Sequence, residues 1–145
     1  KLLKKISRKQ SIAIQRSLNR ISNMAILMIT KRTQRGFKPD GGRFIQYSKA
    51  YKESEDYKKK KNKFVDLTLS GKMFRSLDYR KRGFRNTLLF ANKEREKIAF
   101  LHDTGRGKLP KRPFFAIGRK EEPKLVNEFS KFYFQELGLW AKEKI

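Results

Sequence analysis

The chain contains no cysteine, a single histidine and only 14 acidic residues among 145. Without cysteine, disulfides and thiolate metal sites are excluded, and one histidine gives no basis for a histidine-rich metal cluster. The longest apolar run near the start covers residues 24–29, far short of the roughly 20 residues that a spanning helix needs, and no signal-like hydrophobic region precedes it. We therefore expect no membrane span, no metal site and no cofactor. Because the sequence opens on Lys1, we expect it to be a portion of a longer product.

Positive charge dominates the composition. Lys and Arg total 38, which gives a formal net charge of +24. Such a chain repels itself unless anions or acidic partners surround it, so acidic or polyanionic partners are implied. Apolar residues make up 37% and Phe numbers 12, enough for a packed core. At this length we expect a single domain over residues 1–145.

The order of apolar periods and turn residues predicts an α+β fold, a small antiparallel sheet packed by long N-terminal and C-terminal helices. We expect helices at residues 3–35, 93–103 and from 121 to about 140, with a two-turn helix after Ser70-Gly71. Residues 78–85 and 87–92 predict a hairpin. Residues 37–63, rich in turns and lysine, predict a protruding basic loop or arm that is mobile, although Ser48 could cap a short helix there.

Residues 105–115 (GRGKLPKRPFF) combine a glycine-rich basic loop with a proline-restricted aromatic end. Glycine permits backbone angles closed to other residues, and proline fixes φ, so the loop has a defined shape. Residues 114–117 predict a short buried strand that anchors it. The residues expected to form this structural loop and anchor are Gly105, Pro110, Pro113, Phe114 and Phe115.

Enzymatic chemistry has little support in the sequence. His102 and Asp103 are the only imidazole and carboxylate neighbours, but adjacent residues on a helix do not face each other. Asp40 after Pro39, followed by Asp56-Tyr57-Lys58, matches the order of acids and lysine found in metal-dependent nucleases. These acids lie in a polar arm and not on adjoining strands, where a divalent ion would be held firmly. We expect no enzyme, with the nuclease as a weak alternative.

Basic clusters among aromatic residues also suit nucleic-acid binding. Residues 58–61, 80–85 and 106–112 could each neutralise phosphates. The aromatics fall mostly at core-like positions, and no helix-turn-helix, zinc or RNA-platform motif accompanies them. A free DNA-binding or packaging-associated protein therefore remains an alternative function.

Three blocks in order resemble the tail-completion, or head-tail joining, proteins of tailed phages. A long helix leads into a polar Tyr and Lys segment; residues 67–77 read LTLSGKMFRSL; and residues 98–105 (IAFLHDTG) lead through the basic loop to residues 110–115 (PKRPFF). The last block is similar to that family's helix, His, Gly and Pro-X-Arg-Pro-Phe ending. The lysine-rich arm and the large positive charge depart from the family's usual pattern.

The resemblance implies a structural virion protein of the phage neck, assembled in the host cytoplasm. It would form a ring, with six copies expected, around the DNA channel between the head connector and the tail tube. Non-specific DNA contact is compatible with this role. The expected subunit or partner contacts are basic residues facing outward: Lys58, Lys59, Lys60, Lys61, Arg106, Lys108, Lys111 and Arg112. Arg112 is expected to pair with a carboxylate, on a neighbour or within the fold.

Overall fold

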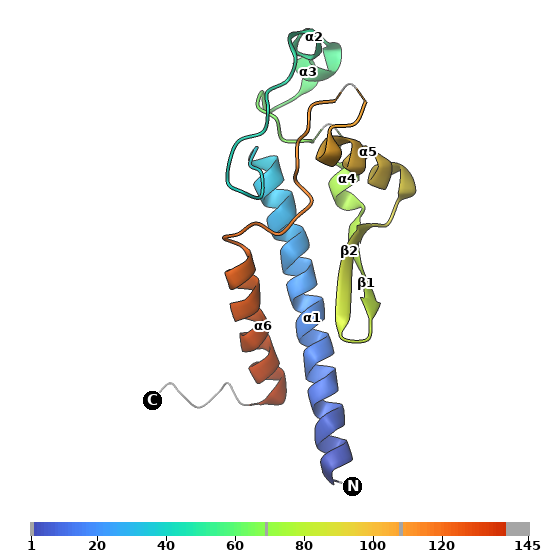
Figure 1. Cartoon of the computed structure of the whole chain (residues 1–145), viewed down its shortest axis with the longest axis vertical. Coiled ribbons are helices and arrows are strands. Elements are labelled where there is room, and N and C mark those ends of the chain that lie inside the picture. Colours follow the sequence, from blue (N-terminus) through green and yellow to red (C-terminus); the bar gives the residue numbers. More distant parts are fainter. Residues whose placement is uncertain (1, 69, 108, 139–145) are drawn as a thin grey trace.

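One long helix forms the axis of the molecule (Figure 1). The computed structural model describes residues 2–68, 70–107 and 109–138. Within them the elements follow in the order α1 (Leu2–Gln34), α2 (Lys49–Lys52), α3 (Glu55–Lys59), α4 (Lys72–Arg75), β1 (Leu77–Arg82), β2 (Arg85–Phe90), α5 (Lys93–Thr104) and α6 (Glu122–Leu137). The α6 helix and the β1–β2 hairpin flank α1 in Figure 1, and α2 and α3 lie at the end opposite the start of α1. The predicted α+β class is confirmed.

The helical period predicted at the start of the chain is confirmed in α1. Small or apolar side chains recur at three- and four-residue steps along its buried face, including Ala13, Ser17, Ala25 and Ile29. The helix ends where Gly36 takes a left-handed conformation, with φ of 82°. A Cβ at Gly36 would lie 2.9 Å from the Phe64 ring, so both the angle and the space call for glycine here.

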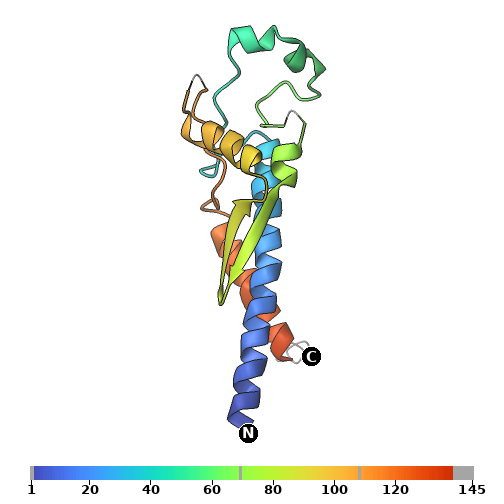
Figure 2. The ribbon, with the colours of Figure 1, turned by 90° about the vertical axis from the view of Figure 1, so that its right-hand side faces the viewer.

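The closing helix α6 packs along α1 (Figures 1 and 2). Pro123 lies in the first turn of α6. Proline has no backbone N–H, but the N–H groups of a first turn have no partner within the helix, so no hydrogen bond is lost. Gly138 ends it with φ of 77°. Glu136 joins the two helices through Arg16, with 2.9 Å between Oε2 and Nη1, and through Arg20 at 3.5 Å.

The predicted hairpin is confirmed with strand bounds shifted by one or more residues. β1 and β2 pair antiparallel from Leu77 opposite Phe90 to Arg82 opposite Arg85. The two-residue turn between them contains Gly83, whose φ of 52° suits a tight hairpin turn. Among the described residues these two strands make up the sheet. Asn86 fixes the hairpin to α1, because its Nδ2 donates to Ser22 Oγ at 2.9 Å.

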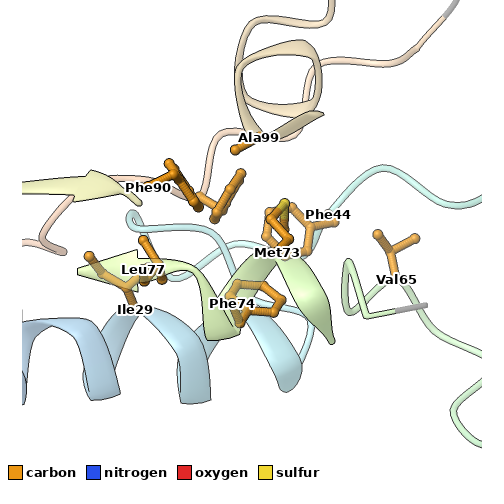
Figure 3. Close-up of a cluster of buried hydrophobic side chains, with 9 residues drawn as sticks. Ile29, Phe44, Val65, Met73, Phe74, Leu77, Phe90 and Ala99 are labelled. Atoms are coloured by element: carbon orange, nitrogen blue, oxygen red, sulfur yellow. The ribbon is translucent and has the colours of Figure 1, made fainter. Parts of the chain in front are cut away.

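The hydrophobic core lies where the C-terminal half of α1 meets α4, α5 and the base of the hairpin. Figure 3 shows Ile29, Leu77, Phe90 and Ala99 among the side chains that converge there. Met73 and Phe74 of α4 complete it, which explains the apolar side of that short helix. The helix has one turn and not the two predicted.

The segment 37–63 differs from the mobile loop that we expected. Ser48 accepts a hydrogen bond from Tyr51 N and begins α2, and Ser54 accepts from Tyr57 N and begins α3. The rings of Tyr47, Tyr51 and Tyr57 pack together with centroids 4.8–5.9 Å apart. Capping and aromatic contacts therefore order a stretch whose lysines suggested otherwise. No helix in the described parts of the chain is both long and apolar enough to cross a membrane.

Candidate interaction surface

The connecting segment, residues 105–118, runs from α5 to α6 past the end of α1 (Figure 1). The predicted strand at residues 114–117 is wrong, because these residues join no ladder. Side chains bind the main chain instead. Asp103 Oδ1 accepts from Phe114 N at 2.8 Å and Phe115 N at 3.0 Å, and Arg32 Nη2 donates to the carbonyls of Phe114 at 2.7 Å and Ala116 at 2.9 Å. The backbone is thus satisfied without a neighbouring strand.

The residues expected to anchor the loop lie in the core or beside it. Phe114 is fully buried, at 0% exposure, and its ring lies edge-on to Phe74 at 5.9 Å. Phe115 is half-buried and packs on Phe90, with 4.9 Å between ring centroids. Pro110 and Pro113 are half-buried.

Gly105 shows why the loop needs glycine. It has φ of 71°, its N–H bonds to Leu101 O, and a Cβ placed on it would lie 2.7 Å from the backbone of Lys111. Gly107 also has a positive φ, of 73°, but open space around it. The turn after α5 is therefore closely packed at Gly105 and exposed at Gly107.

Arg112 does not face outward as predicted. It is 4% exposed; its Nε donates to Ile45 O at 3.1 Å and its Nη2 to Gln46 O at 3.3 Å. The guanidinium also lies 5.2 Å from the centre of the Tyr47 ring. No carboxylate of the described residues forms an ion pair with it, which corrects the expected pairing within the fold. Arg112 fastens the connecting segment to residues 45–47.

Lys60 is also buried, unlike the exposed side chain that we predicted. Its Nζ lies 2.5 Å from Asp66 Oδ1 and 2.8 Å from Thr68 O, with both members of the ion pair about 5% exposed or less. Asp66 Oδ1 accepts a further bond from Thr68 N at 3.0 Å. Burial is tolerated because the charges are paired and hydrogen-bonded. This lysine holds the arm to the segment before α4.

The other predicted contact residues are exposed where the structure describes them. The exposed side chains are those of Lys58, Lys59, Lys61, Arg106 and Lys111. Lys58 pairs with Glu55 at 2.7 Å, and Arg106 lies 5.2 Å over the Phe100 ring. The Phe100 side chain is itself 46% exposed. Lys108 lies outside the described residues. Contact with a partner stays a prediction for these side chains.

A cavity of about 320 Å³ opens between the arm and the connecting segment. Tyr47, Tyr51, Pro110 and Arg112 line it together with His102. Burial, followed by the charge of Asp66, raises the pKa of Tyr47 to about 12. Burial, followed by the charge of Arg112, lowers the pKa of His102. Two tyrosines and His102 therefore share the cavity wall with two charged side chains, Arg112 and Lys60.

The His102 and Asp103 pair does not form a catalytic unit in this geometry. The Asp103 carboxylate bonds to the backbone of the connecting segment, whereas His102 Nδ1 is buried without a hydrogen-bond partner in the described parts of the chain. An imidazole that no carboxylate orients lacks the arrangement of a general base.

The acids of the nuclease alternative lie on separate elements that are not strands. Asp40 Oδ1 accepts from Gly42 N at 2.8 Å, and this bond, followed by one from Lys38, lowers the pKa of Asp40. Asp56 lies in the first turn of α3. No group of three or more His, Cys, Asp or Glu side chains is placed to hold a metal ion in the described ranges.

An ion pair that the sequence reading missed joins α1 to the start of α6. Arg32 Nη1 bonds to Glu121 Oε2, which also accepts from Gly118 N at 2.7 Å. Burial lowers the pKa of Arg32, and the charge of Glu121 partly offsets this by raising it. Neither residue alone points to this pair, since a basic residue near a helix end and an acid at a helix start are both common. Nothing in the spacing linked them.

A second surface feature is apolar. A groove of about 380 Å³ lies between α1, α6 and the connecting segment. It is lined by Leu18, Ile21, Glu122, Leu125, Phe129, Ile117 and Val126. Val126 is 62% exposed and Ile117 36%.

Comparisons with family models, with curated proteins and with solved structures found no match to this chain. The resemblance to tail-completion proteins therefore stays a prediction.

Proposed function

We propose that this protein is a structural subunit of the phage neck that assembles into a ring joining the tail to the head connector around the DNA channel. One observation carries the proposal: a single copy leaves an apolar groove open between its two long helices. Further large apolar side chains are exposed on the same helices, among them Leu27 at 50% and Phe134 at 42%. An exposed apolar groove is typical of protein interfaces.

The groove supports contacts between identical subunits. Full burial of a side chain such as Val126 contributes about 1.5–3 kcal/mol. A neighbour that inserts a different surface into the groove makes a heterologous contact, and repeated contacts of this type form a ring when the rotation between neighbours closes. The buried ion pair of Lys60 and the partly buried pair of Arg32 help to give each subunit a fixed shape, which identical repeated contacts require.

Charge supports contact with acidic neighbours. Lys59, Lys61 and Lys111 are exposed and form no salt bridge in the described portion of the chain. Carboxylate-rich surfaces of the connector or tail tube would complement them and favour encounter with the correct partner. The geometry of the acids described above does not favour the nuclease alternative.

The test is the mass of the purified chain in solution, with two variants matched in charge. Light scattering at about 0.5 M salt, where self-repulsion is screened to a few ångströms, should give a mass of several copies. Val126→Glu places a charge in the groove and should weaken association about 10-fold or more. Asn127→Glu makes the same charge change at the next exposed position of α6 and should leave the mass unchanged. A wild-type monomer, or equal behaviour of the two variants, would refute the groove as the subunit interface.

A further inference from the structure

The turn of the hairpin is basic, exposed and aromatic at once. Arg82, Phe84 and Arg85 are all exposed, with Phe84 at 63%. The register places Arg82 directly opposite Arg85, an arrangement in which like charges repel across the strands. The only acid on the hairpin, Asp78, lies near the other end of β1. The free protein therefore holds a repulsive arrangement that an anion would relieve.

The first turns of α1 extend this charge along the molecule. Figures 1 and 2 show the hairpin turn pointing along α1 toward its start. At 100° per residue, Lys4 and Arg8 share the helix face of Asn19 and Ser22, the residues that contact Asn86 of the hairpin. Both are exposed, and at 1.5 Å per residue they lie roughly 16–22 Å along the axis from Asn19.

No negative charge interrupts this surface. The first acidic residue of the sequence is Asp40, so α1 contains none. We define the basic strip as Lys4, Arg8, Lys81, Arg82 and Arg85, five exposed cations with no salt bridge in the described part of the chain. The cations of α1 also lie at the positive end of the helix dipole, which disfavours them in the free protein.

We propose that the basic strip binds duplex DNA, with the hairpin turn at the major groove and the α1 cations on the flanking phosphates. DNA offers closely spaced negative charges without intervening cations, which matches a strip of one sign. The exposed Phe84 ring suits apolar base edges such as the thymine methyl group. The wide B-form major groove admits a two-stranded ribbon, whereas the deep and narrow groove of duplex RNA does not.

The experiment measures binding of the full chain to a labelled duplex of about 20 base pairs as a function of salt. The logarithm of the binding constant should fall linearly with the logarithm of salt, with a slope of about 0.9 per phosphate contact. Arg82→Gln with Arg85→Gln should therefore reduce the slope by about 1.8. Lys4→Gln with Arg8→Gln should do the same. Phe84→Ala should lower affinity about fivefold, because an apolar contact is lost, and should leave the slope unchanged, because no charge is lost.

The matched control removes the same charge elsewhere. Lys49 and Lys52 are exposed on α2, at the far end of the molecule from the start of α1 (Figure 1). Lys49→Gln with Lys52→Gln should leave the slope unchanged. An equal loss of slope in this control would show that net charge alone drives binding and would overturn the proposal.

Other ligands and readouts separate the remaining outcomes. Equal binding of duplex RNA, or stronger binding of polyglutamate that depends on the same residues, would overturn the assignment to DNA. Unchanged affinity after Phe84→Ala would overturn the docking of the hairpin turn. Light scattering of each variant keeps DNA binding distinct from ring formation, because the basic strip and the apolar groove share no residue.

Discussion

Replacement of Arg112 with alanine should destabilise the whole fold and not simply remove a surface contact. The side chain is 4% exposed, donates to the carbonyls of Ile45 and Gln46 and lies against the Tyr47 ring. It therefore joins the connecting segment to the stretch just before α2. Loss of the side chain would detach the connecting segment from the stretch before α2.

The magnitude follows from two opposing contributions. Hydrogen bonds from a charged group contribute about 1.5–3 kcal/mol each. Burial of a guanidinium without a carboxylate partner costs part of that gain. Residues 45 and 46 are themselves exposed, so water can bind their carbonyls once Arg112 is gone. A net loss of about 2–4 kcal/mol in the free energy of unfolding is expected, which for a chain of this length lowers Tm by about 5–15 °C.

The assay is urea and thermal unfolding followed by circular dichroism. Lys111→Ala is the control, since Lys111 is the adjacent residue and is exposed, and it should change stability by no more than about 0.5 kcal/mol. Arg112→Met should fall between the two, because it keeps contact with Tyr47 but loses the hydrogen bonds. If Arg112→Ala were as stable as Lys111→Ala, the structural role of this side chain would be wrong.

Two further predictions concern the same region. Gly105→Ala should lower the free energy of unfolding by roughly 2–5 kcal/mol, because the new Cβ clashes with the Lys111 backbone and alanine is strained at this φ. Gly107→Ala is strained in the same way but lies in open space, so it should cost about 1–2 kcal/mol. Equal losses for the two variants in urea unfolding would contradict this. In the folded protein, burial and then the charge of Arg112 lower the pKa of His102 from its ordinary value of 6.5. Near and below that pH, the imidazole therefore binds a proton more readily in the unfolded chain than in the folded protein. The free energy of unfolding should therefore fall as the pH drops from about 7.5 to 5, a range that lies above the usual pKa values of carboxyl groups. If the same dependence on pH persists in His102→Gln, another group causes it.

The sequence predicted the elements whose signals are local. The period of α1 and the hairpin each depend on residues close in the chain, and both appear in the structure. Ser48 is a possible helix cap by residue type, but the neighbouring lysines favour a mobile loop when the sequence alone is considered. The packing of the three tyrosines that accompanies the cap could not be read from their spacing.

The errors at the candidate site have one physical cause. The extended stretch after Pro113 has the composition of a strand, but its partners are the side chains of Asp103 and Arg32, which lie on two different helices. Arg112 and Lys60 look like members of exposed basic runs, yet both are buried. Arg112 binds the carbonyl of Ile45, which is distant in the sequence, and Lys60 binds Asp66 where the chain folds back only six residues later. Charge runs predict exposure on average and cannot identify the one member that turns inward.

Electron microscopy of the purified, DNA-free protein tests the central proposal most directly. The account predicts closed rings of uniform copy number with a central opening, which Val126→Glu disperses and Asn127→Glu preserves. Single elongated particles at every concentration and salt tested would contradict it.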